Sequence, residues 1–171
     1  MKLATISALL AVGSCFGAAT ATAATCNTQL GPISSTATVQ GNNCGNNPNF
    51  TGTTFCGGVS FSATGTDAWA INIGTGQNFT FTVTSTGVVG PPATTFLPEI
   101  ALLGTCADNG ACPVENTTGT GTVVSPTVSG QAAGTYFIIV TDSSATGAQC
   151  GPYDLSFAGT LPVKLENFSV E

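Results

Sequence analysis

The alternation of apolar and polar side chains between Gly65 and Gly90 predicts two β-strands. Large apolar residues occupy every second position in both halves of this stretch: Trp69, Ile71 and Ile73, then Phe79, Phe81 and Val83. Alanine, asparagine and threonine stand between them, a period of two that buries one face of a strand and leaves the other wet. The break at Gly74–Gln77 is glycine-rich, so the two runs together predict a β-hairpin.

Shorter patterns on the N-terminal side predict additional strands. Ile33, Ala37 and Val39 favour one strand, and the asparagine-rich stretch from Gly41 to Asn49 that follows predicts a long loop. Val59 and Phe61 then begin a strand that leads into the central pair.

The C-terminal half continues in the same way. We expect a loop over 87–95 because of its two prolines, strands over 99–105 and near 113–115, and a proline-interrupted edge strand around Val123–Val128. Residues 136–140 are apolar on both faces, which favours a central strand covered on both sides. A last strand carries Tyr153, Leu155 and Phe157. About nine or ten short strands without helical periodicity predict an all-β sandwich.

The first residues have the features of a secretory signal. Lys2 precedes an apolar run from Leu3 to Val12, and Ala21–Ala23 forms an A-x-A cleavage site. The alternative is a lipoprotein signal that anchors the protein through Cys15. We therefore divide the chain into a signal peptide at 1–23, an N-terminal strand with a Cys/Asn-rich loop at 24–58, a sandwich core at 59–160 and a strand-like tail at 161–171.

Charge and segment length limit the possible partners and location. The chain has two basic residues, Lys2 and Lys164, against eight acids, and neither arginine nor histidine. Binding to nucleic acid requires cations against phosphate, so a nucleic-acid partner is excluded. No segment after the signal is long and apolar enough for a transmembrane helix, so we expect a secreted protein or one at the cell surface without a membrane span.

Six cysteines remain after either form of signal processing, as an oxidising compartment predicts: Cys26, Cys44, Cys56, Cys106, Cys112 and Cys150. Cys106 and Cys112 flank the tight-turn sequence Asp108–Gly110, so we expect them to form one disulfide. The remaining expected pairs are Cys44 with Cys56 and Cys26 with Cys150.

Several short motifs resemble the bacterial pre-peptidase C-terminal domain over residues 59–158: Asp67-Ala-Trp69, Gly76-Gln77, Phe79–Val83, Gly134–Val140 and Gly151–Leu155. The resemblance implies a small, secreted, jelly-roll-like sandwich, a family usually appended to enzymes. Two features depart from it. Phe96–Ile100 replaces the acidic strand motif of the family, and no enzyme is attached. The resemblance therefore implies a fold and secretion, and not an activity.

Catalytic chemistry is difficult to place on this sequence, and we expect no enzyme. Without histidine, Ser-His-Asp and Cys-His arrangements are absent. The acids at 67, 108, 142 and 154 each lie beside a turn, and we interpret them as solvated turn carboxylates. Bound Ca²⁺ is the alternative cofactor, with Asp142 and Asp154 as its candidate ligands.

Two features of the sequence relate to carbohydrate, and each has a simpler interpretation. Aromatic residues can hold polysaccharide, but those at strand positions are expected in the core, and only Phe50 and Phe55 lie in loops. The Asn-x-Ser/Thr triplets at Asn49, Asn78, Asn116 and Asn167 are glycan acceptors in principle, and chance occurrence is expected in a threonine-rich chain.

The tail suggests self-association. Its apolar positions alternate, with one change of phase: Leu161, Val163 and Leu165, then Phe168 and Val170. This strand either pairs within its own sandwich or completes a neighbour's sheet, which would produce a homo-oligomer or filament. The sequence thus predicts a secreted or cell-surface structural protein, which in the second case is the subunit of an extracellular filament. The alternative function is a carbohydrate- or calcium-binding accessory module.

Overall fold

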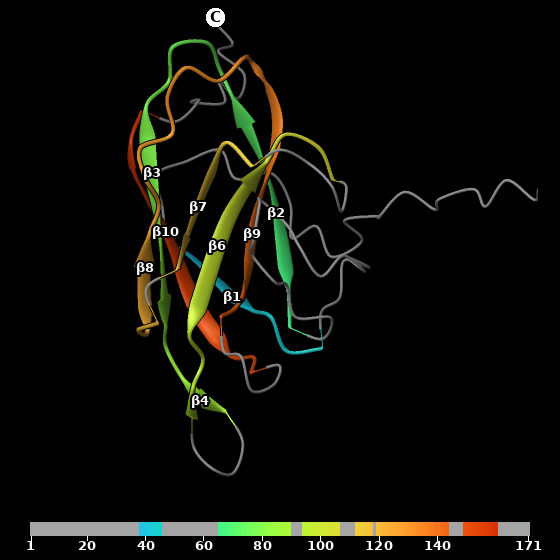
Figure 1. The fold of residues 1–171 in the computed structure, drawn as a ribbon, viewed down its shortest axis with the longest axis vertical. Helices are drawn as coiled ribbons and strands as arrows, with labels where there is room; N and C mark the ends of the chain where they lie inside the picture. Colours follow the sequence, from blue (N-terminus) through green and yellow to red (C-terminus); the bar gives the residue numbers. More distant parts are fainter. Residues whose placement is uncertain are drawn as a thin grey trace, which may run out of the picture.

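Two four-stranded antiparallel sheets face each other in the computed structural model, which describes residues 38–45, 65–89, 94–106, 112–117, 119–143 and 149–160 (Figure 1). The first sheet has the order β1 (Val39–Asn42), β10 (Pro152–Gly159), β3 (Phe79–Ser85) and β8 (Thr122–Val124). The second has the order β2 (Asp67–Ile73), β9 (Gly134–Asp142), β6 (Pro98–Leu103) and β7 (Val114–Thr117). The predicted all-β sandwich is confirmed.

The connections between these strands are those of a jelly roll. A small two-stranded unit, β4 (Val88–Val89) with β5 (Thr94–Thr95), stands apart from the two sheets. Along the rest of the chain, every step from one strand to the next crosses to the other sheet except the hairpin of β6 and β7. Eight strands arranged in this way form the two interlocked Greek keys of a jelly roll.

The hairpin predicted for the two central strands is wrong. β2 pairs with β9 in one sheet, and β3 pairs with β10 and β8 in the other. The connection Gly74–Gln77 does turn sharply, with Gly76 at a φ of 75° and the Gln77 amide donating to the Gly74 carbonyl at 3.4 Å. The alternation shows that each strand buries one face. That face is buried whether the two strands pair in one sheet or lie in opposite sheets, so the alternation does not determine which strands pair.

The main core lies between the sheets. It is formed by large side chains from both, including Ile71, Phe81, Ile100, Ile138 and Leu155, all fully buried. A second apolar cluster lies on the outer side of the β2-β9-β6-β7 sheet and contains Ala68, Ala101, Leu103 and Ile139. The central position of β9, buried on both faces, is therefore confirmed. β2 has an outer face that is mostly buried, where the alternation predicted a wet one.

Most of the other predicted elements are confirmed. β6 and β7 form a hairpin, β8 lies at a sheet edge beside Pro126, and β10 buries Tyr153, Leu155 and Phe157. Two predicted loops contain strands instead: β4 and β5 pair within 87–95, and β1 includes Gly41 and Asn42. Both are short strands that form by pairing with another strand. In β1, the glycine and the asparagine allow this extended conformation without favouring it.

Some predictions concern parts of the chain outside the described residues. These are the signal at 1–23, Cys15, Cys26, Ile33, Ala37, Phe50, Phe55, Cys56, Val59, Phe61, Asp108, and the tail with its five apolar positions. β1, from the expected N-terminal segment, is a full member of the first sheet through four residue pairs with β10.

Candidate functional site

A disulfide between Cys44 and Cys150 joins the ends of β1 and β10. The two Cα atoms are 4.8 Å apart, and 106 positions separate the residues in the sequence. The pairs predicted for these cysteines, Cys44 with Cys56 and Cys26 with Cys150, are therefore wrong. The strand register explains the observed pair: Asn42 lies opposite Pro152, and the same register extended by two residues sets Cys44 opposite Cys150.

Asn43 reinforces this end of the sandwich from a fully buried position. Its side chain accepts a hydrogen bond from the Gly151 amide at 2.7 Å and donates one to the Gly65 carbonyl at 2.7 Å. One amide group thus ties β1 to the residues that precede β10 and β2. A buried asparagine with both ends satisfied adds specificity to the packing at little desolvation cost.

Cys106 and Cys112 are both disulfide-bonded, as a bond between them requires. Both also pack against the outer apolar cluster that contains Ala101 and Leu103. Their mutual pairing stays a prediction, supported by their position at the two ends of the β6–β7 connection.

A buried polar chain links the two sheets beneath β1. The Tyr153 hydroxyl donates to the Asp67 carboxylate at 2.5 Å and accepts from the Trp69 indole N–H at 2.7 Å. All three side chains are buried. Burial and the neighbouring Asp67 carboxylate, which also accepts the Tyr153 hydrogen bond, raise the Tyr153 pKa far above its ordinary value, while the Trp69 bond opposes this slightly.

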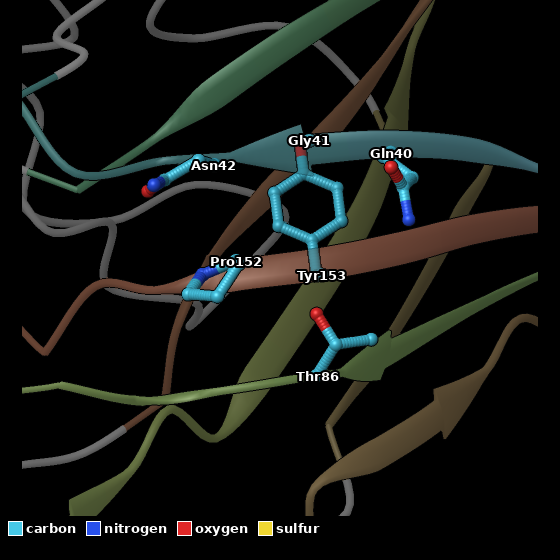
Figure 2. A pocket seen from close by; sticks show the side chains of 6 residues that line it. All are labelled: Gln40, Gly41, Asn42, Thr86, Pro152 and Tyr153. Atoms are coloured by element: carbon cyan, nitrogen blue, oxygen red, sulfur yellow. The ribbon is translucent and has the colours of Figure 1, made fainter.

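Glycine is required at position 41 because the Tyr153 ring occupies the space beside it. A Cβ atom there would lie 2.4 Å from Cζ of that ring. Figure 2 shows the ring extending from β10 towards β1, with its hydroxyl end at Gly41. Because Gly41 has no side chain, the Tyr153 ring can pass β1 and reach the opposite sheet.

Tyr153→Phe is expected to lower the free energy of unfolding by about 2 kcal/mol, because the buried Trp69 N–H loses its acceptor and Asp67 loses a donor. Urea unfolding followed by Trp69 emission measures this change. Tyr136→Phe is the matched control, since the exposed Tyr136 hydroxyl donates only to the Ala132 carbonyl, at 3.1 Å. An equal loss in both variants would contradict the assigned role.

A hollow of about 480 Å³ opens beside this chain, at the end of β1, β10 and β3. Its lining residues are Gln40, Gly41, Asn42, Thr86, Pro152 and Tyr153 (Figure 2). Asn42 already accepts the Cys44 amide through Oδ1 at 3.0 Å. The lining holds the amide side chains of Gln40 and Asn42 and the Thr86 hydroxyl, and no charged side chain.

The two candidate calcium ligands are not brought together as a metal site. Asp142 is 4 % exposed, and its carboxylate accepts the amides of Leu97 at 3.4 Å and Gln149 at 3.0 Å. Asp154 lies in the other sheet, on β10, where Gln40 of β1 and Thr84 of β3 are its neighbours. Its buried Oδ1 has no hydrogen-bond partner. Across the described part of the chain, no three His, Cys, Asp or Glu side chains are grouped to hold a metal ion.

A buried glutamate is the feature that the sequence did not reveal. Glu99 is 6 % exposed on the outer side of β6, where Thr141 and Thr117 lie opposite it on the neighbouring strands. With Glu115 and Thr117 it borders a hollow of about 190 Å³. Burial, and then repulsion from Glu115 and Asp142, raises the Glu99 pKa to about 7. The signal in the sequence was that Glu99 directly precedes the apolar run Ile100–Leu103, in a segment predicted to be a strand.

The aromatic residues on strands lie in the core or against the outer cluster. Trp69, Phe79, Phe81 and Phe157 are buried, and Phe137 packs against the outer cluster. This confirms core packing over sugar contact for the first four. Of the possible glycan acceptors, Asn78 is exposed, and Asn116 uses its side chain to donate to the Val124 carbonyl at 2.7 Å.

Among the described residues, no helix is long and apolar enough to cross a membrane.

Comparison with known proteins gives a likeness of fold. No protein-family model matches the chain, and no curated protein is similar to it in sequence. Among solved structures, the chain is similar to the pre-peptidase C-terminal domain of collagenase from Bacillus anthracis, with 14% identity, a TM-score of 0.46, and coverage of 76% of this chain and 96% of that one. It is also similar to PliG of Aeromonas hydrophila, a periplasmic inhibitor of g-type lysozyme, with 14% identity, a TM-score of 0.47, and coverage of 75% and 94%. The first is a domain of the family that the sequence motifs resemble.

Proposed function

We propose that this chain is a non-catalytic structural protein of the extracellular space or cell surface, which associates with copies of itself by donating residues 161–171 as a strand. The observation that carries the proposal is that the strands of the described residues already form an eight-stranded jelly roll, whose last strand, β10, ends at Gly159. We expect residues 161–171 to supply a further strand.

The tail begins at a fixed point. Thr160 donates its amide to the Asn78 carbonyl at 2.9 Å, and its hydroxyl accepts the Asn78 amide at 3.0 Å. β3 begins at the next residue, Phe79, so it has no strand residues left for the tail to pair with. A strand that continues past this point needs a sheet edge elsewhere to satisfy its backbone groups.

The pattern of the tail supports the same conclusion. The core side chains of β10 are at odd-numbered positions, and Leu161, Val163 and Leu165 continue in that phase. An apolar face of this kind is unfavourable in water and is covered when it adds to another sheet. Disulfide bonds persist in oxidising compartments, so the Cys44–Cys150 bond fits an extracellular or envelope location, where such assembly would take place.

The test compares the secreted chain with a version that ends at Thr160, both checked for folding by circular dichroism. We expect fibres or large oligomers from the first by negative-stain microscopy, and monomers from the second. Lys164 is the single tryptic site after Lys2, and in the assemblies we expect trypsin to leave it uncut. Folded monomers at high concentration, trimmed by trypsin at Lys164, would contradict self-association and direct attention to the hollow at Gln40 and Thr86 as a ligand site.

A further inference from the structure

Glu99 is a buried carboxyl without a hydrogen bond. Its side chain is 6 % exposed, and among the described residues no donor is bonded to its carboxyl group. These residues also include no lysine, arginine or histidine, so no basic side chain in the described part of the chain balances its charge. Because buried polar groups are nearly always paired, an exception of this kind indicates a partner that is not part of the protein, such as water or an ion.

The other carboxyls that are wholly or partly buried differ from Glu99. Asp67 accepts a tyrosine hydroxyl, and Asp142 accepts two backbone amides. Asp154 has one buried oxygen without a partner, but its neighbours on β1 and β3 are uncharged. Within the described residues, Glu99 is therefore the one buried carboxyl that lacks a hydrogen bond and also has a second carboxyl beside it.

The register of the β6–β7 hairpin brings that second carboxyl, Glu115, to the same face of the sheet. Glu99 lies opposite Thr117, and Ala101 lies opposite Glu115. Residues that face each other across an antiparallel pair share a face, as do alternate residues along one strand. Glu99 and Glu115 are therefore diagonal neighbours on the outer face, at a separation that long side chains can bridge.

Both carboxyls border the same small hollow. Its volume is about 190 Å³, and Asn116 and Thr117 complete its lining. Pockets for organic ligands usually measure about 300–1,000 Å³, so this hollow is better matched to one ion with its water. Glu115 repels the ionised form of Glu99, and burial strengthens this repulsion. A cation in the hollow would offset it and would supply the partner that the Glu99 carboxylate lacks.

We propose that this hollow binds one Ca²⁺ ion through the carboxylates of Glu99 and Glu115, with the Thr117 hydroxyl and water as further ligands. Ca²⁺ takes six to eight oxygen ligands in flexible geometry, whereas Mg²⁺ requires a near-ideal octahedron. Affinity follows the number of charged ligands, so two carboxylates give a weak site, with a Kd of about 1 mM, as in extracellular modules. The site includes no residue of the tail, so it does not depend on self-association.

Urea unfolding of the full secreted chain at pH 8, above the Glu99 pKa of about 7, tests the site. When about 10 mM CaCl₂ replaces EDTA at equal ionic strength, we expect the folding equilibrium constant to rise about tenfold, as a site of about 1 mM requires. Isothermal titration calorimetry should find one Ca²⁺ per chain. Glu99→Gln and Glu115→Gln should each lose the rise and the binding heat. Asp154→Asn, the matched control, removes a carboxylate of the other sheet and should keep both.

Three results would overturn the site. The first is a parent protein that is folded, as buried Trp69 emission verifies, and shows neither binding heat nor a rise in stability. The second is a rise that persists undiminished in Glu99→Gln, because Ca²⁺ would then act elsewhere or by general screening of an acidic chain. The third is an equal rise with MgCl₂, which would contradict the assignment to Ca²⁺.

Discussion

Replacing both Cys44 and Cys150 by serine is expected to lower the free energy of unfolding by about 5 kcal/mol, the largest effect of any change considered for this protein. The bond closes a loop across a sequence separation of 106, nearly the whole sandwich. In the chain-entropy account, a cross-link stabilises the fold by restricting the unfolded chain, and the restriction grows with the length of the closed loop.

Guanidinium unfolding of the oxidised parent and of the double variant measures this difference. Cys106→Ser with Cys112→Ser is the matched control: a bond between these two would close a short loop and contribute only about 2 kcal/mol. A similar loss in both double variants would contradict the dependence on loop length. A loss of well under 2 kcal/mol in the first would show that the β1–β10 register holds this end without the bond.

Raising the pH from 4 to 8 is expected to lower the free energy of unfolding by up to about 3 kcal/mol through Glu99 alone. The pKa of this carboxyl is about 7 in the folded protein against an ordinary 4.5. The folded state therefore binds the proton more tightly than the unfolded state. The stabilisation is complete below pH 4.5 and is lost as the pH rises through 7, where the buried side chain must ionise.

Glu99→Gln keeps the shape and polarity of the protonated side chain, so we expect it to remove this loss and to be more stable than the parent at pH 8. Urea midpoints measured between pH 4 and 9 give the comparison. Glu115→Gln removes the larger of the two repulsions but leaves the burial of Glu99, so the transition should persist and move to lower pH. An unchanged pH profile in Glu99→Gln would show that Glu99 is not the titrating group.

The candidate hollow and the buried chain of Tyr153, Asp67 and Trp69 could not be found from the sequence. Thr86 is more than forty positions from Gln40 and Asn42 in the sequence, and the three residues meet because β10 lies between β1 and β3. Asp67 and Trp69 similarly resemble ordinary strand residues until Tyr153 reaches them across the core. Local patterns describe which face of a strand is buried and contain no information on which strand lies opposite.

The sequence by itself determined the all-β class, the position of most strands, and the burial of Trp69, Phe79 and Phe81, because a period of two and frequent turn residues are local properties of the chain. Only the tertiary structure decided that β2 and β3 lie in different sheets, that Cys44 bonds to Cys150, and that Glu99 is buried. These depend on strand register and sheet order, which arise from contacts between residues distant in sequence. A buried face can be satisfied by several partners, and the choice is made by packing of the whole core.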